Sequence, residues 1–377
     1  MRDTNYSRAY LKIDLGRIEH NFDVLSSLLP ADAMRCAVVK ADAYGHGAAA
    51  VAGMLESKVD YFAVATVDEG LSLRDDGIKK PILILTAVDP REYEQVMGYG
   101  LIPTIIDLPR AKLLSDLAVS AGSVVRFHAA VDTGMGRIGF PVTEEAAKTL
   151  KEISGLPGLE LEGVFSHYAE ADSPGCDFTR IQTERFVTFL GMLKNEGVTV
   201  PIRHICNSAA VMEKERSFDM VRIGIAMYGL GPSEEMGLNG LDLLPAMEAV
   251  AHVITVKDVP PGTGISYGRK FVSDRGMKVA TISIGYADGY NRAFSDKADV
   301  LIKGVRCRVL GRVCMDQTMV DVSAVPDVKE GDPVTLMGRS GEETVTAGEL
   351  GRLGESCNYE IICTFSPRMK KVYTELD

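Results

Sequence analysis

A lysine at the end of an apolar run has the residue type and setting for covalent chemistry. Val38 and Val39 lead directly into Lys40, and a turn that contains Tyr44 and Gly45 follows at once. An ammonium group at the mouth of a buried strand loses hydration, which lowers its pKa. Lysines of this kind act as bases and form Schiff bases with aldehydes. An isolated strand-end lysine can also simply extend its charged end into water, so other residues must decide between these readings.

Further candidate residues lie at or near the ends of several later apolar runs. They are Asp132, Thr133, Arg137, His167, Asn207, Ser208, Arg222, Gly224 and Ile225. Ser208 offers a hydroxyl group, and Gly224 allows backbone N–H groups to approach a phosphate closely. A Schiff-base lysine together with a phosphate site matches the aldehyde and the phosphate group of pyridoxal phosphate. Taken singly, His167 reads as a buried histidine, Arg222 as an ion-pair partner and Asn207 as a helix cap. Only their conjunction indicates a cofactor site.

The elements that must position these residues alternate along the first part of the chain. Eight short apolar runs are separated by amphipathic stretches that predict helices, and the runs cover 35–39, 61–67, 81–87, 101–106, 124–131, 159–167, 201–206 and 220–228. This alternation is typical of parallel β/α units, and eight units close a (β/α)8 barrel. A doubly wound open sheet remains the alternative. In a barrel, the polar residues at the strand ends would meet at the active-site end.

The pattern of apolar segments along the sequence changes after about residue 244. Short β-rich segments separated by Gly, Pro and Asp cover 247–256, 278–284, 300–302, 305–313, 318–322, 333–337 and 359–364. This pattern predicts a C-terminal all-β domain. We therefore expect an α/β chain with a barrel at 14–243 and a β domain at 244–377, which residues 8–13 could join as a strand.

Composition excludes several classes of protein. With 377 residues the chain suits two domains, and its net charge of −11 argues against a nucleic-acid partner. We find no segment typical of a signal peptide or a membrane span. The seven cysteines form no C-x-x-C pair and show no metal-ligand spacing, so we expect reduced core thiols, no metal site and a cytoplasmic location.

One glycine motif supports a different reading. Residues 134–139, GMGRIG, satisfy the G-x-G-x-x-G pattern of dinucleotide-binding proteins and would make the chain an NAD-dependent oxidoreductase. However, Pro141 and Thr143 predict that the following helix begins after the last glycine, whereas the fingerprint opens its helix within the glycines. We rank this reading second.

Nine ordered segments carry a resemblance to a known family. They are VVKADAYGHG (38–47), VDTGMGRIGF (131–140), SHYAEAD (166–172), HICNSAA (204–210), VRIGIAMYG (221–229), SYGRKF (266–271), IGYADGYNR (284–292), GRVCMDQTMVDV (311–322) and NYEIICTFSPR (358–368). On these segments, the chain resembles the bacterial alanine racemases, which are fold-type III pyridoxal-phosphate enzymes, over nearly its whole length. The resemblance implies a β/α barrel followed by a β domain, and interconversion of L- and D-alanine to supply peptidoglycan.

The resemblance also implies roles for individual residues. Lys40 matches the lysine that holds the cofactor and acts as one base, and Tyr267 matches the opposing base, which the other subunit of a homodimer supplies. Two further groups of residues match family positions. Those that match contacts with the cofactor are Tyr44, His167, Asn207, Ser208, Arg222, Gly224, Ile225 and Tyr359. Those that match contacts with the substrate or its entrance are Arg137, Met315, Tyr286 and Arg292.

One position departs from the family pattern. Many members have a lysine two places before the Asp of DTGMGR, whereas this chain has Ala130 there. We therefore expect another group to position Arg137, and we expect activity with an altered affinity for the substrate carboxylate. A serine or broad-specificity amino-acid racemase shares this scaffold, although Tyr359 favours alanine. A fold-type III decarboxylase and a non-catalytic pyridoxal-phosphate carrier fit less well, because the decarboxylase segments are not evident and the carrier lacks a β domain.

Overall fold

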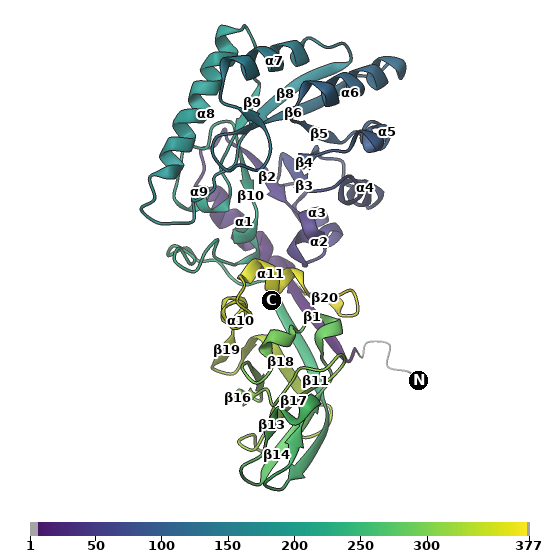
Figure 1. The fold of residues 1–377 in the computed structure, drawn as a ribbon, viewed down its shortest axis with the longest axis vertical. Coiled ribbons are helices and arrows are strands. Elements are labelled where there is room, and N and C mark those ends of the chain that lie inside the picture. Colours follow the sequence, from purple (N-terminus) through teal and green to yellow (C-terminus); the bar gives the residue numbers. More distant parts are fainter. Residues whose placement is uncertain (1–6, 375–377) are drawn as a thin grey trace. The chain divides into compact units, whose positions relative to one another are not determined.

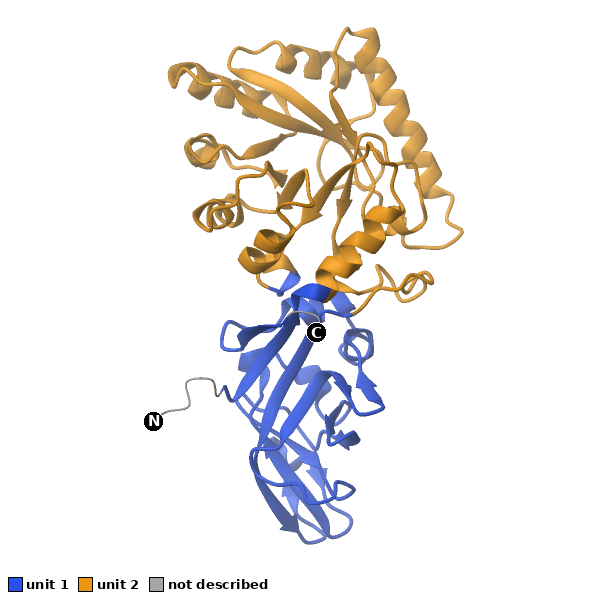
Figure 2. Cartoon of the chain, turned by 180° about the vertical axis from the view of Figure 1, so that it is seen from behind, with its two compact units in different colours: residues 1–16, 44–46, 245–377 blue, residues 17–43, 47–244 orange. Residues whose placement is uncertain are grey.

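The computed structural model describes residues 7–374 and divides the chain into two compact units (Figures 1 and 2). Unit 2 comprises residues 17–43 and 47–244, and unit 1 comprises residues 1–16, 44–46 and 245–377. No helix among the described residues is both long and apolar enough to cross a membrane.

Unit 2 is a nearly closed parallel barrel with helices around its outside (Figure 1). Its hydrogen-bonded strand order is β10-β2-β3-β4-β5-β6-β8-β9. The strands are β2 (Met34–Val38), β3 (Tyr61–Val64), β4 (Ile82–Ala87), β5 (Ile102–Ile105), β6 (Val125–Asp132), β8 (Leu159–Phe165), β9 (Ile202–His204) and β10 (Met220–Ile223), and the two-residue β7 (Phe140–Pro141) pairs with β6. Between β9 and β10, the Asp219 N–H donates to the Arg203 carbonyl at 3.0 Å and the Arg222 N–H donates to the Cys206 carbonyl at 3.0 Å. The eight-stranded barrel is confirmed, and an open doubly wound sheet is excluded.

Local sequence signals explain where the barrel helices begin. Thr66, Asp107 and Thr143 each accept a backbone N–H in the first turn of the helix that follows, which satisfies groups that would otherwise lack a partner. The helices and helical turns of this part are α1 (Leu15–Ser27), α2 (Lys40–Tyr44), α3 (Ala48–Leu55), α4 (Val67–Asp75), η1 (Pro90–Glu92), α5 (Tyr93–Gly98), α6 (Leu108–Ser120), α7 (Glu144–Ser154), α8 (Phe178–Asn195), α9 (Ser208–Met212) and η2 (Ile225–Tyr228).

Unit 1 is built around the long strand β11 (Met247–Val259). β11 pairs antiparallel with β1 (Ala9–Asp14), β14 (Met277–Ile282) and β18 (Pro333–Ser340). Strand β1, near the N-terminus, therefore lies in the same sheet as β11. The remaining strands are β12 (Gly264–Ile265), β13 (Phe271–Val272), β15 (Asp299–Ile302), β16 (Val305–Arg308), β17 (Thr318–Asp321), β19 (Glu343–Val345) and β20 (Lys370–Thr374), and the single helical turns are η3 (Tyr267–Arg269), η4 (Tyr286–Asp288) and η5 (Arg292–Phe294).

The C-terminal domain is mostly β, and it also contains two short helices, α10 (Ala347–Leu353) and α11 (Asn358–Cys363). The strand expected at 359–364 is wrong, because α11 occupies these residues. A short apolar run such as Ile361-Ile362 is buried equally well in a helix or a strand, so its hydrophobicity does not distinguish the two. The cysteines are also not all core residues, because Cys357 and Cys363 are exposed.

Candidate active site

The lysine that ends the first barrel strand opens a left-handed turn. Lys40 follows β2 and is half-buried, and the next four residues have φ of 51°, 53°, 53° and 52° (Ala41, Asp42, Ala43 and Tyr44). For L-residues this conformation costs about 1–2 kcal/mol per residue, because Cβ crowds the following carbonyl oxygen. A strained segment of this kind persists only where its surroundings hold it, and such segments cluster at functional sites.

A buried arginine lies at the end of the eighth barrel strand. Arg222 is 3% exposed, and its guanidinium donates to His204 Nδ1 at 2.7 Å and to His167 Nδ1 at 3.0 Å. It also donates to the carbonyls of Ser166 and Ile205, at 2.8 and 3.0 Å. Burial lowers the pKa of Arg222 to about 10. Among the described residues no carboxylate forms an ion pair with Arg222, which is unusual because buried charges are normally paired.

The donor pattern fixes the protonation of three histidines around Arg222. A guanidinium only donates, so Nδ1 of His167 and Nδ1 of His204 are both acceptors and their protons lie on Nε2. His204 Nε2 therefore donates to His128 Nδ1 at 2.8 Å, and His128 Nε2 donates to the Glu162 carboxylate at 3.2 Å. Arg222 thus begins a directional hydrogen-bond chain through two neutral imidazoles to a carboxylate.

The surroundings of these rings favour the same protonation state. Burial is the largest cause that lowers the pKa of His128, His167 and His204, and for His167 and His204 the pKa falls well below its ordinary value. The positive charges of Arg222, Arg137 and Lys40 lower the pKa of His167 further. Burial raises the pKa of the Glu162 carboxyl, but the hydrogen bond from His128 and the nearby positive charge of Arg126 together lower it below its ordinary value.

The Ser208 hydroxyl group and Gly224 contact one another just beyond the ends of β9 and β10. Ser208 is buried, and its Oγ accepts the Gly224 N–H at 2.8 Å and the Ala226 N–H at 3.4 Å. Within the part of the chain that the structure describes, the Ser208 O–H itself has no acceptor, so it can donate to a phosphate oxygen. Asn207 caps α9 by accepting the Ala210 N–H at 3.0 Å. Ile225 follows Gly224 as the first residue of η2 and is buried.

The glycine loop at 134–139 is explained by local packing. Asp132 Oδ1 accepts the N–H groups of Gly134 and Gly136, at 2.9 and 3.0 Å. A Cβ at Gly134 would meet the Phe178 ring at 2.6 Å. The next helix begins at Thr143, its N-cap, as expected, so the loop does not open a helix as a dinucleotide site requires.

Arg137 lies in this loop and is exposed. Across residues 7–374 its side chain makes no hydrogen bond or ion pair, and the buried Ala130 offers none. Nothing in the described chain therefore takes the place of the lysine that many family members have at position 130.

Unit 1 carries the other predicted residues. Tyr267 is 69% exposed on η3, and it lines two hollows of about 620 and 680 Å³. Met315 lines the first hollow, and Tyr286 and Arg292 line the second. In the same unit, Tyr44 packs against Tyr359 of α11 with ring centroids 6.2 Å apart.

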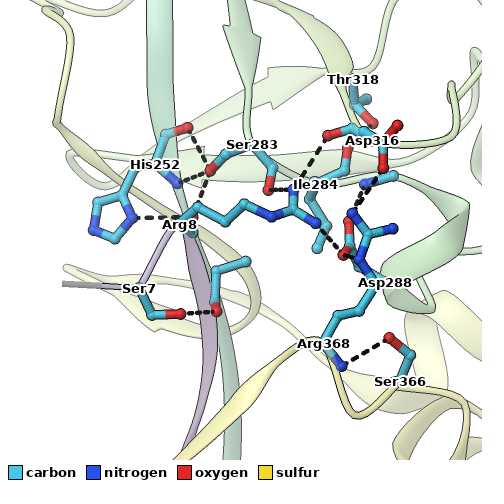
Figure 3. A network of polar contacts seen from close by, with 12 residues as sticks. Ser7, Arg8, His252, Ser283, Ile284, Asp288, Asp316, Thr318, Ser366 and Arg368 are labelled. Carbon is cyan, nitrogen blue, oxygen red and sulfur yellow. Dashed lines mark hydrogen bonds and ion pairs between the residues drawn. The ribbon is translucent and has the colours of Figure 1, made fainter. Parts of the chain in front are cut away.

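A buried carboxylate holds the loops that carry Tyr286 and Met315 (Figure 3). Asp288 is fully buried, accepts the Gly285 N–H at 3.0 Å, and pairs with Arg8 and, at 3.3 Å, with Arg368. Arg368 also binds Asp316 at 2.8 Å, next to Met315. The Tyr286 N–H donates to the Cys314 carbonyl at 3.0 Å, which ties the two loops together directly. This network was not apparent from the sequence, because its members come from both ends of the chain.

The chain matches two family models, described as the alanine racemase N-terminal domain over residues 13–232 and the alanine racemase C-terminal domain over residues 246–373. An alanine racemase from Halothermothrix orenii is 40% identical over 366 residues, which cover 97% of this chain and 96% of that protein. Alanine racemase 1 from Clostridium acetobutylicum is also 40% identical over 366 residues, covering 97% of this chain and 95% of the relative.

Solved structures agree over the same length. An alanine racemase from Clostridium difficile 630 superposes with a TM-score of 0.94 at 39% identity and covers 98% of this chain and 96% of its own. The alanine racemase from Bacillus anthracis with bound L-Ala-P superposes with a TM-score of 0.91 at 37% identity, covering 98% of this chain and 95% of its own. On this similarity in sequence and in fold, the chain belongs to the alanine racemase family of isomerases.

Proposed function

We propose that this chain interconverts L-alanine and D-alanine, with pyridoxal phosphate bound through Lys40 and with Tyr267 of the partner subunit completing the site. Membership of a family that uses pyridoxal phosphate supports the proposal. So does the match to a relative solved with L-Ala-P. The proposal includes a homodimer, and the D-alanine formed would serve peptidoglycan synthesis.

The surroundings of Arg222 are the observation that carries the proposal. Its buried guanidinium has only neutral partners, and among the described residues Nη1 makes only one hydrogen bond, so a second N–H remains for an acceptor such as a pyridine nitrogen. Ser208 retains a hydroxyl proton for a phosphate group, and Lys40 provides an amine for an aldehyde. The residues present therefore fit the three functional groups of pyridoxal phosphate.

The residues divide the reaction between them. When bound, pyridoxal phosphate supplies the electron sink that acidifies the α-hydrogen of an amino acid. Lys40 would exchange a proton with the α-carbon on one face, and the Tyr267 phenol of the partner subunit would do so on the other face. Two bases on opposite faces invert the centre without turning the substrate over, each having a proton affinity suited to its step.

Arg222 and Arg137 would bind without transferring protons. The neutral Nδ1 of His167 accepts from Arg222 and so orients the guanidinium, which stays protonated at neutral pH. Arg137 and the Met315 backbone would bind the substrate carboxylate, because a guanidinium forms paired hydrogen bonds with it. Tyr286 and Arg292 would lie near the substrate entrance.

Racemisation assays test the proposal. The purified protein should convert L-alanine to D-alanine, and L-serine more slowly, whereas Lys40→Ala and Tyr267→Phe should each be inactive in homodimers. A heterodimer of the two variants should recover activity, because shared sites leave one site intact and one doubly inactivated. A proven heterodimer without activity would contradict the shared site.

A further inference from the structure

The left-handed turn after β2 needs support from outside itself. Ala41 to Tyr44 contain no glycine, yet all four have positive φ. Without tertiary contacts, such a turn would relax to ordinary backbone geometry, and the direction of the adjacent Lys40 would change with it.

One carboxylate ties this turn to the neighbouring strand. Glu69 Oε1 accepts the Ala41 N–H at 2.7 Å, and that N–H belongs to the peptide that joins Lys40 to Ala41. Glu69 Oε2 accepts the N–H groups of Ala65 and Thr66, at 2.7 and 3.2 Å. Because β2 and β3 are adjacent in the barrel, Glu69 connects the ends of two neighbouring strands.

An ordinary helix cap accounts for only half of these contacts. Thr66 and Glu69 form a capping box at the start of α4, in which the glutamate reaches back to the cap residue. That role uses only Oε2, whereas Oε1 contacts the turn after Lys40. Separate hydrogen bonds hold the C-terminal side of the turn. The Asp42 carboxylate accepts the Ala48 N–H at 2.7 Å, and the Asp42 backbone carbonyl accepts the Gly47 N–H at 2.8 Å.

We propose that Glu69 is a positioning residue for Lys40, holding the left-handed turn so that the amine stays directed at the end of the barrel where Arg222 lies. This inference rests on the proposed function in that Lys40 is the amine that binds pyridoxal phosphate. Both oxygens of the carboxylate are required. In Glu69→Gln one side would present an N–H₂ group to a backbone N–H, and that contact would be lost.

The test compares Glu69→Gln with Thr66→Ala in the full-length chain. Thr66→Ala is a matched control, because it removes the side chain that accepts the Glu69 N–H at 3.3 Å in the same capping box and keeps the carboxylate. For each protein we would measure amide hydrogen exchange in the segment 40–47, the dissociation constant for pyridoxal phosphate by absorption, and Tm.

The two variants should differ in what they change. Both should lower Tm by a similar amount. Only Glu69→Gln should speed exchange in the segment 40–47 at least tenfold and raise the dissociation constant about tenfold, a change of 1.4 kcal/mol. Ala41→Gly added to Glu69→Gln should recover most of the affinity, because glycine adopts positive φ without strain.

Equal exchange rates and dissociation constants in Glu69→Gln and Thr66→Ala would overturn the inference. If Glu69→Gln is insoluble, Glu69→Asp serves instead, since its shorter side chain cannot reach both strand ends. A wild-type chain that fails to bind pyridoxal phosphate would refute the proposed function. The exchange comparison would then still decide whether Glu69 holds the turn.

Discussion

Mild acid should destabilise this protein through the buried histidines of the barrel. His167 and His204 have pKa values well below the ordinary 6.5, and the pKa of His128 is also lowered. The unfolded chain therefore binds protons below about pH 6.5 that the folded chain does not bind. Stability contributed by these neutral rings is complete above pH 6.5 and is lost as the pH falls below it.

The size of the effect follows from proton linkage. Well below pH 6.5, each ring that stays neutral in the folded state costs about 1.4 kcal/mol of unfolding free energy per pH unit. Between pH 7.5 and 5.5, two to three such rings amount to about 3–4 kcal/mol. This is a large part of the 5–15 kcal/mol that is typical of native proteins.

Urea unfolding at fixed protein concentration, followed by circular dichroism at pH 7.5, 6.5 and 5.5, measures this loss. Replacing His204 by Gln should reduce the pH dependence by about 1.4 kcal/mol over this range. A wild-type loss below 1 kcal/mol would refute the assignment of neutral tautomers around Arg222.

Three further changes should have distinct outcomes. Ala41→Gly should stabilise the chain by up to about 1 kcal/mol in thermal unfolding, because Ala41 is exposed and its positive φ suits glycine; destabilisation would show that the turn is not strained. Asp288→Asn should destabilise unit 1 by about 3 kcal/mol in urea, because it leaves Arg8 and Arg368 facing a neutral side chain in place of a buried carboxylate; a change within 0.5 kcal/mol would contradict that pairing. Ala130→Lys should alter the KM for alanine and its dependence on added anions, whereas an unchanged KM and anion response would show that Arg137 needs no partner.

Residues at the ends of barrel strands were predictable, because the carboxyl ends of parallel strands meet at one end of a barrel. The pattern of apolar runs predicted positions near strand ends for Lys40, His167, Ser208 and Arg222, and the structure brings these residues to one end of the barrel. The helix starts were equally predictable, since capping by a residue such as Thr143 is a local interaction.

Other features depend on contacts that local patterns do not encode. His128 and Glu162 lie inside strands, and the available signal was that charged or polar residues interrupt strands that should be almost wholly apolar. The left-handed turn at Ala41–Tyr44 contradicts the preference of each of its residues, so only tertiary contacts such as that of Glu69 explain it. The helix at Asn358–Cys363 was missed because six residues are too few to show a period.

Reductive trapping would show directly whether Lys40 holds pyridoxal phosphate. The purified protein would be loaded with pyridoxal phosphate, reduced with borohydride, digested and mapped by mass spectrometry. We expect a yellow protein whose reduced cofactor maps to Lys40 and to no other lysine. A protein that stays colourless with added pyridoxal phosphate, or a cofactor mapped to another lysine, would contradict it.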